Sequence, residues 1–316
     1  MTTTLDRAVI RLDPHSLKVK RFSTLTTMVL PTLGTVLAVY LLVTRQFSIL
    51  DLALFAGMYC VHMFGSTVGL HRYAAHRSFK TSRWLEDVLM VAGGMAAQGP
   101  LLFWVATHRR HHRFADHEGD PHSPNLHGAG WKRRLHGLWY AHMPWMLSEE
   151  STKWSVFAPD ILRDRRLVAH HRLYPYWVLA GLALPALIGF AIGQTAWSAF
   201  TGLVFGGFAR IFAANQASWC VASICHAYGR RPFANDDHST NLWWVAVLTF
   251  GEGLQNNHHA FPRSFRHAVR WWEPDLNGWL IAALGKAHLV WGLREPSAEM
   301  ISKRRSGNNL PETRSA

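Results

Sequence analysis

Apolar runs alternate with polar segments along this chain in a pattern typical of helical membrane proteins. Residues 25–44 carry no charged side chain and are long enough to cross a bilayer as a helix. A second apolar run, 47–70, follows almost at once. The runs 175–193 and 196–215 repeat this arrangement. The pattern therefore predicts two transmembrane hairpins with very short turns.

Two further apolar stretches do not fit a simple hairpin. The stretch 88–106 is interrupted by glycines, Gln98 and Pro100. A fifth span here would place the polar regions on its two sides on opposite faces of the membrane. We therefore expect it to be buried in the cytoplasmic domain or to lie at the membrane surface. The stretch 277–293 is expected to form an interfacial or docking helix.

Composition supports a membrane protein with a large polar part. Hydrophobic residues make up 49% of the chain, charged residues only 17%, and there are 15 tryptophans. The net charge is +13, and most basic residues lie before, between or after the predicted hairpins. By the positive-inside rule these three regions, and both termini, are cytoplasmic. An anionic partner is a secondary interpretation of the charge, but no nucleic-acid-binding motif is present.

Histidine is the residue type that stands out. There are 20 histidines and only 3 cysteines, and the cysteines form no CxxC motif, so neither a disulfide framework nor an iron–sulfur cluster is expected. The histidines gather in three clusters: "HRYAAH" with His71 and His76, "HRRHH" with His108, His111 and His112, and "QNNHH" with Gln255, His258 and His259. Imidazole binds zinc, copper, iron and nickel, so the clusters predict a metal site without choosing the metal.

Helical geometry gives a first expectation for these side chains. Positions i, i+3 and i+4 of a helix share one face, so His108, His111 and His112 are expected to converge on one centre. His258 and His259 are adjacent and cannot point the same way. Such a pair suits either two metals or one metal held from a bent segment.

Four segments, in this order along the chain, resemble the membrane fatty acyl desaturases of the stearoyl-CoA desaturase type: "HRYAAHRSF", "HRRHHRFADHEGDPHSP", "HAYGRRPF" and "GEGLQNNHHAFP". The resemblance extends from about residue 25 to about residue 293. It implies four transmembrane helices and a cytoplasmic catalytic domain. It also implies two iron ions held by histidines, O2 as co-substrate, and removal of two hydrogens from a long acyl chain.

The resemblance also implies which residues bind the metals: His71, His76, His108, His111, His112, His226, His258 and His259. Gln255 stands where the family commonly has one further histidine, and its side chain can offer a carbonyl oxygen or hold a water. Four residues before His226, animal members have an asparagine that holds a metal-bound water, and this chain has Ala222. We therefore expect a diiron site with altered coordination, and a change of this kind can alter the reaction outcome.

On the substrate side, the resemblance places four residues at or near an acyl tunnel: Trp104, Gln98, Ser218 and Trp219. Animal members have an Arg-Asp pair that binds the acyl carrier just before the second histidine cluster. This chain has Ala106 and Thr107 there, which leaves coenzyme A and acyl carrier protein both open. The basic surface suits the acidic acyl carrier protein.

The function expected from the sequence is an oxygen-dependent desaturase that acts on a long-chain acyl thioester, either acyl-CoA or acyl-ACP, with membrane lipid around the protein. An acetylenase or hydroxylase on the same scaffold remains open, as do an inactive relative and a non-catalytic histidine-rich metal-binding protein. The chain contains no cytochrome b5-like or ferredoxin segment and no "HPGG" haem motif. Electrons are therefore expected from a separate donor of one of these two kinds.

The predicted fold is an all-α membrane protein with two transmembrane hairpins and a helical cytoplasmic domain that holds a dimetal site. We divide the chain into a cytoplasmic segment 1–24, a first hairpin 25–70, a catalytic region 71–174, a second hairpin 175–215, a second catalytic region 216–294 and a polar tail 295–316.

Overall fold

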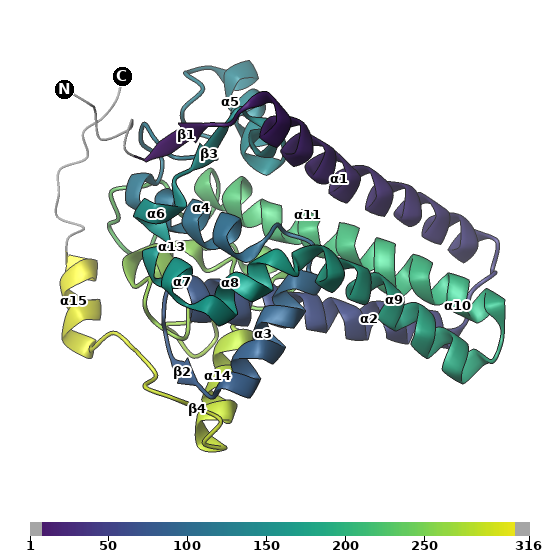
Figure 1. Cartoon of the computed structure of the whole chain (residues 1–316). Coiled ribbons are helices and arrows are strands. Elements are labelled where there is room, and N and C mark those ends of the chain that lie inside the picture. Colours follow the sequence, from purple (N-terminus) through teal and green to yellow (C-terminus); the bar gives the residue numbers. More distant parts are fainter. Residues whose placement is uncertain (1–7, 307–316) are drawn as a thin grey trace.

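The computed structural model describes residues 8–306, and these residues are mostly helical. Figure 1 shows long helices that extend to one end of the molecule, while shorter helices gather at the other end. This arrangement confirms the expected all-α architecture. The ends of the first and last predicted segments, 1–7 and 307–316, lie outside the described residues.

Four helices are long and apolar enough to cross a membrane: Pro14–Val43, Ile49–Ala75, Tyr174–Gly193 and Ala196–His226. The first is α1 and the third is α9. The second consists of α2 (Ile49–Met63) and the π-helical η1 (Phe64–Ala75). The fourth consists of α10 (Ala196–Gly202), the π-helical η3 (Leu203–Ala209), α11 (Arg210–Ala222) and the short η4 (Ile224–His226). The expected number of spanning helices is therefore confirmed.

Capped turns join the helices of each hairpin. In the first turn, the Ser48 hydroxyl accepts from the backbone N–H of Asp51 at 3.4 Å, and the Asp51 carboxylate accepts from the backbone N–H of Ser48 at 2.8 Å. Thr195 and Ser198 form the same kind of capping box in the second turn. Asp51 therefore caps a helix. A charged residue inside a membrane span can mark a transport pathway, but this capping role explains the position of Asp51 in an apolar run.

Three helix boundaries differ from those expected. α1 begins at Pro14 instead of near residue 25, because the Asp13 carboxylate accepts backbone N–H groups at its N-terminus. The second spanning helix continues past residue 70 to Ala75, so His71 lies inside this helix. The fourth continues past residue 215.

The apolar stretch 88–106 is not a single span. It belongs to α3 (Arg83–Met95) and α4 (Leu101–Phe114), which are separated by a break around Gly99. Gly99 has a φ of 103°, which a residue with a side chain rarely adopts, and Pro100 precedes the next helix. α3 packs against η1 and α9. α4 packs against α6 and α8 of the polar domain as well as against η1. The expected burial in the polar domain therefore holds for α4, whereas α3 packs mainly on the spanning helices.

Shorter elements complete the polar end: α5 (Trp131–His142), η2 (Pro144–Leu147), α6 (Trp154–Phe157), α7 (Pro159–Arg163), α8 (Arg165–Arg172), α12 (Trp243–Leu248), α13 (Gln255–Ala260), α14 (Leu276–Lys286) and α15 (Ala298–Ser306). Two small antiparallel pairs join distant segments: β1 (Val9–Arg11) with β3 (Glu150–Thr152), and β2 (Lys80–Thr81) with β4 (Val290–Trp291). The apolar stretch 277–293, expected to be one helix, is helical only in its first part, because α14 ends at Lys286 and β4 follows.

A buried arginine attaches the second spanning helix to the C-terminal part of the domain. Arg72 is 1% exposed, and its guanidinium donates to Glu252 Oε1 at 3.0 Å and to Asp275 Oδ1 at 2.8 Å. It also donates to the Phe265 carbonyl at 2.9 Å. Breaking a buried network of this kind is costly, so Arg72 fixes η1 relative to the segments on both sides of α13.

A second buried arginine holds the bundle itself. Arg210 donates to the carbonyls of Gly206 at 3.0 Å, Met95 at 2.9 Å and Gly181 at 2.7 Å. These carbonyls belong to η3, α3 and α9, so Arg210 connects three helices. Its place within a span is therefore explained by packing of the bundle.

Candidate metal centre

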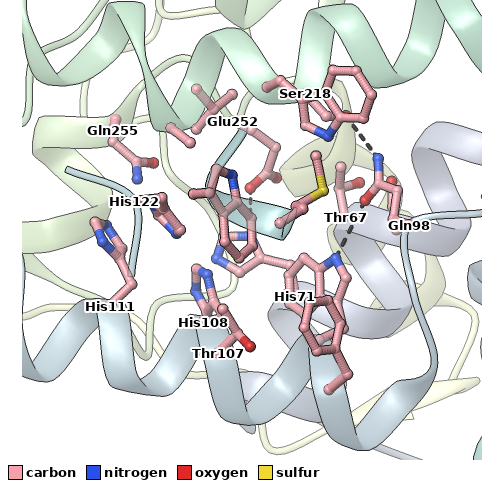
Figure 2. Close-up of a pocket in the computed structure, with 18 residues that line it drawn as sticks. Thr67, His71, Gln98, Thr107, His108, His111, His122, Ser218, Glu252 and Gln255 are labelled. Atoms are coloured by element: carbon pink, nitrogen blue, oxygen red, sulfur yellow. Dashed lines mark hydrogen bonds and ion pairs between the residues drawn. The ribbon is translucent and has the colours of Figure 1, made fainter. Parts of the chain in front are cut away.

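Three helices and one short turn bring the histidine clusters together. η1 carries His71 and ends at its C-cap residue His76. The other elements are α4 with His108, His111 and His112, η4 with His226, and α13 with His258 and His259. Figure 2 shows His71 of η1, His108 and His111 of α4, and Gln255 of α13 around one cavity. π-Helical turns are frequent at functional sites, and η1 places His71 in such a turn.

Five histidines form the first group: His71, His76, His108, His112 and His258. One ring nitrogen of each lies within 4.8 Å of all the others. Nε2 of His76 is 2.7 Å from Nε2 of His108. Nε2 of His258 is 3.0 Å from that of His71 and 2.9 Å from that of His112. Five inward-facing imidazoles at such distances form a donor set that suits a metal ion.

The second group contains His111, His226 and His259, and Gln255 lies beside it. The Gln255 amide nitrogen is 3.0 Å from His259 Nε2 and 3.5 Å from His226 Nε2. His111 Nε2 and the Gln255 amide oxygen are buried and have no hydrogen-bond partner within residues 8–306. A half-turn of the amide exchanges its oxygen and nitrogen, so the oxygen can face the same centre. These unpartnered atoms also fit a metal ion.

The structure corrects the expectation that His108, His111 and His112 converge on one centre. His108 and His112 belong to the first group and His111 to the second. Consecutive residues of an α-helix are about 100° apart, so His111 and His112 face neighbouring centres. His258 and His259 are divided in the same way.

Each histidine of the second group presents its Nδ1 to a carboxylate. The pairs are His111 with Asp120 (3.0 Å), His226 with Asp116 (2.7 Å) and His259 with Asp237 (2.7 Å). In the first group, Nδ1 of His71 contacts Glu252. A carboxylate at Nδ1 fixes the tautomer and turns Nε2 toward the centre, as in many carboxylate–histidine–metal arrangements.

Burial keeps most of these imidazoles neutral. Burial, reinforced by neighbouring histidines, lowers the pKa of four first-group residues well below the ordinary value: His76, His108, His112 and His258. Burial also lowers the pKa of His259 to about 4, although Asp237 opposes the shift. For His111, burial is outweighed by Asp120 together with the nearby Asp116 and Asp237, and the pKa is raised. A metal ligand must be deprotonated, so the neutral imidazoles are ready to bind a metal.

Several buried residues of the site were missed in the sequence. Glu252 contacts Nδ1 of His71 and lies 3.8 Å from Nδ1 of His267. The His267 ring centre is 4.4 Å from that of His258, and neither His267 nitrogen has a hydrogen-bond partner among the described residues. Glu252 lies in the quoted "GEGLQNNHHAFP" segment, where an acidic residue next to histidines was a usable signal. His267 carries no comparable signal.

His122 was also missed. Its ring stacks on that of His111 with the ring centres 4.4 Å apart, and it lines the cavity. The partners Asp116 and Asp120 lie in the same quoted segment as His122, "FADHEGDPHSP". The density of acidic and histidine residues there was a signal, but it did not indicate which histidine each carboxylate holds.

A cavity of about 150 Å³ opens beside the two groups. Its lining includes all four residues expected near the acyl tunnel, Gln98, Trp104, Ser218 and Trp219, and also Ala222. Gln98 donates to the Ser218 hydroxyl at 3.0 Å and accepts from the Trp104 indole N–H at 3.3 Å, as the dashed lines of Figure 2 indicate. The lining is mostly apolar and ends at the histidines, so an alkyl chain can lie next to them.

These features define an integral membrane protein whose buried histidine groups can hold metal ions beside an apolar cavity. The model of the family described as fatty acid desaturase matches residues 49–292. The chain therefore belongs to the fatty acid desaturase family, which confirms the resemblance seen in the sequence. It is therefore an oxidoreductase, an enzyme that desaturates fatty acids.

Three relatives illustrate the range of this family. The chain is 43% identical over 279 residues to "Hex-5-enoyl-[acyl-carrier protein] acetylenase" of Moorena producens, with 88% of this chain and 87% of the relative covered. It is 40% identical over 222 residues to "sn-1 stearoyl-lipid 9-desaturase" of Anabaena variabilis, covering 70% and 74%. It is 35% identical over 239 residues to "Acyl-CoA C20 Delta5-desaturase" of Anemone leveillei, covering 74% and 70%.

Proposed function

We propose that this protein is an oxygen-dependent desaturase that introduces a double bond into a long-chain acyl thioester. One observation carries the proposal: two adjoining groups of inward-facing imidazoles lie at an apolar cavity among membrane-spanning helices. A cavity of this kind accepts an alkyl chain, and the donor sets accept redox-active metals. Family membership supports the reaction class.

The first group would hold one iron ion through its five histidines. The second would hold another through His111, His226 and His259, with Gln255 beside them. Bound iron would supply the activation of O2 that oxidation of an unactivated methylene requires. The protein's own carboxylates, such as Asp237, accept hydrogen bonds from the Nδ1–H groups and keep each Nε2 directed at the centre.

The cavity wall would choose which carbons react. A methylene carries no polar group that the protein can recognise, and each buried CH2 contributes only about 0.8 kcal/mol, so chain position must be set by shape. Trp104 lies at the end of the cavity next to the histidines, and its ring is stacked on that of His108 with the ring centres 5.1 Å apart. We infer that Trp104 confines the chain next to the first group, and that Gln98 and Ser218 shape the cavity further along.

The acyl carrier is coenzyme A or acyl carrier protein. Ala106 and Thr107, at the positions of the animal Arg-Asp pair, are 0% and 6% exposed. A buried alanine and a buried threonine offer no charge to a carrier. We infer that other basic side chains contact the carrier, and the net charge of +13 suits an acidic carrier protein.

Electrons would come from a separate ferredoxin or cytochrome b5-like donor, because the chain holds neither a haem motif nor a cysteine cluster. The histidine-bearing end would face the cytoplasm together with both termini. The distribution of lysine and arginine supports this orientation.

A second candidate function is acetylenase activity, the oxidation of an alkene to an alkyne, and hydroxylation is a further variant. Two residues favour it. Gln255 brings an amide where the family commonly has an imidazole, and Ala222 lines the same cavity. A weaker donor changes the electronic properties of the metal it touches. The acetylenase relative at 43% identity supports the same alternative.

The test is a fatty-acid profile by gas chromatography and mass spectrometry. The protein would be expressed in a host of defined lipid composition beside the double variant His108→Ala, His112→Ala. His136→Ala, an exposed histidine on α5, serves as the matched control. We expect a new double bond that disappears in the double variant and persists in the control. A triple bond or a hydroxyl group would favour the alternative, and identical profiles for all three proteins would contradict both.

A further inference from the structure

α12 lies beside the second spanning helix and presents an uncharged surface. The carbonyl of Leu248, its last residue, accepts from the hydroxyl of Tyr59 at 2.7 Å, and Tyr59 lies within the span Ile49–Ala75. α12 also packs against α11 of the fourth span. The outward side chains are all large and apolar: Trp243, Trp244, Val247 and Leu248, which are 70%, 36%, 46% and 46% exposed. This face is therefore continuous with the lipid-facing surface of the bundle.

The opposite end of α12 borders a basic pocket of about 510 Å³. Its lining includes three arginines and two tryptophans: Arg230, Arg231, Arg270, Trp243 and Trp272. The Arg270 guanidinium lies over the Trp272 ring, 5.2 Å from its centre. Within residues 8–306, the ion pairs of the protein include neither Arg230 nor Arg270. Two guanidinium groups therefore border the pocket without an acidic partner.

One acidic side chain lines the pocket, and its charge is largely satisfied. Glu273 is 8% exposed. Its Oε2 accepts from the Asn257 side chain at 2.9 Å and from the backbone N–H groups of Val269 at 2.7 Å and Arg270 at 2.9 Å. The charge open to an occupant is thus positive.

We propose that the basic pocket binds the headgroup of an anionic phospholipid. The phosphate lies between Arg230 and Arg270, Trp243 and Trp272 lie at the level of the glycerol backbone, and the acyl chains run along the exposed face of α12. Guanidinium groups bind phosphate oxygens in a bidentate manner, and tryptophan is enriched where apolar and polar zones of a membrane meet. The occupant is a lipid because the pocket continues into an apolar, membrane-facing helix.

The same pocket connects to the helix that carries metal ligands. The pocket-lining Asn241 donates from its side chain to Asn257 Oδ1 at 2.7 Å and accepts from the Asn257 backbone N–H at 3.1 Å. Asn257 lies in α13, directly before His258. Leu254, also in the lining, accepts from the His258 backbone N–H at 3.0 Å. A lipid bound in the pocket therefore stabilises Asn241 and Leu254, whose hydrogen bonds hold α13 in place.

The experiment is native mass spectrometry of the purified protein released from micelles that contain phosphatidylglycerol or phosphatidylcholine. The variant Arg230→Gln, Arg270→Gln removes the two free guanidinium groups. The control Arg163→Gln, Arg165→Gln removes the same charge from α7 and α8, away from the pocket. Two arginines near a membrane surface contribute about 1 kcal/mol each, so we expect retention of phosphatidylglycerol to weaken about 30-fold in the first variant only.

A second measurement tests the link to α13. Phosphatidylglycerol should raise the melting temperature of the iron-free protein and of the control, but not that of Arg230→Gln, Arg270→Gln. Equal retention of phosphatidylglycerol by both variants would overturn the proposal. It would also be overturned if the pocket variant lost binding of an acidic ferredoxin while it retained the lipid, because the pocket would then recognise a protein. Displacement of the lipid by inorganic phosphate would assign the pocket to a soluble phosphate.

Discussion

At the scale of single residues, two of the three carboxylates that hold the second histidine group are distant in the sequence from the histidines they contact. Asp116 is 110 positions from His226, and Asp237 is 22 positions from His259. The histidines themselves could be chosen from their clusters and from the family resemblance. Their partners could not, because a carboxylate acquires this role only when the fold brings it to a particular Nδ1. Glu252 had a usable signal in the sequence, because it lies beside the histidines of its own segment, whereas His267 had none.

Asp237→Asn should weaken the metal site without unfolding the protein. The amide can still contact His259 but no longer stabilises the tautomer that directs Nε2 inward, and changes of this kind reduce metal affinity about 10–100-fold. The neighbouring Asp236→Asn is a close control, because the Asp236 side chain is fully exposed. Competition with a graded iron chelator measures the difference. Equal iron retention by both variants would show that Asp237 has no part in the site.

Gln255→His should strengthen the second group. It adds an imidazole between His226 and His259, where the amide nitrogen now lies 3.5 and 3.0 Å from their Nε2 atoms. We expect iron to leave this variant more slowly and the ratio of alkene to more oxidised products to change. Gln255→Ala should lose iron faster than the natural protein. Chelator kinetics and product analysis that do not distinguish the three proteins would mean that Gln255 is not a donor.

At the scale of elements, the sequence predicted the existence of the spanning helices better than their internal geometry. Hydropathy identifies a span, but nothing in "FGSTVGLHRYAA" indicates that η1 is π-helical. This geometry matters because it sets the direction of His71. The expectation for α4 failed for a related reason: the helical face of His108 and His112 is predictable, whereas the presence of a second centre facing His111 depends on η4 and α13.

Close packing against α3 positions η1, and substitutions at two glycines can test this. A Cβ on Gly65 would lie 2.2 Å from the backbone carbon of Ala92, so Gly65→Ala should push η1 away from α3. Overpacking of this kind costs about 1–3 kcal/mol. Gly57 is the matched control on the same spanning helix, because a Cβ there meets nothing within 4 Å. Thermal unfolding should show a lower midpoint and lost iron for Gly65→Ala alone. Identical behaviour of the two variants would contradict the packing argument.

At the scale of the whole molecule, the number of spans and the all-α class followed from the sequence because a bilayer imposes its thickness on apolar helices. The boundaries did not follow. α1 begins before the apolar run because Asp13 caps it, and the second spanning helix continues into the polar domain because Arg72 anchors it there. Both effects depend on polar contacts that a hydropathy profile does not contain.

The proposed orientation predicts a labelling pattern. In a protein whose three cysteines are replaced by alanine, Gln46→Cys lies in the turn of the first hairpin and Glu299→Cys lies in α15. A membrane-impermeant maleimide should label the first variant in intact cells, and the second only after the membrane is permeabilised. The reverse pattern would place the histidine groups on the outer side of the membrane.

The central claim is that two adjoining histidine groups each hold an iron ion. The most direct test is the iron content per chain of the purified protein, measured by inductively coupled plasma mass spectrometry. The natural protein and the exposed-histidine control His136→Ala should each contain two irons. His112→Ala in the first group and His111→Ala in the second should each lose iron. Iron content that is unchanged in either variant, or a natural protein that binds no iron, would contradict the account.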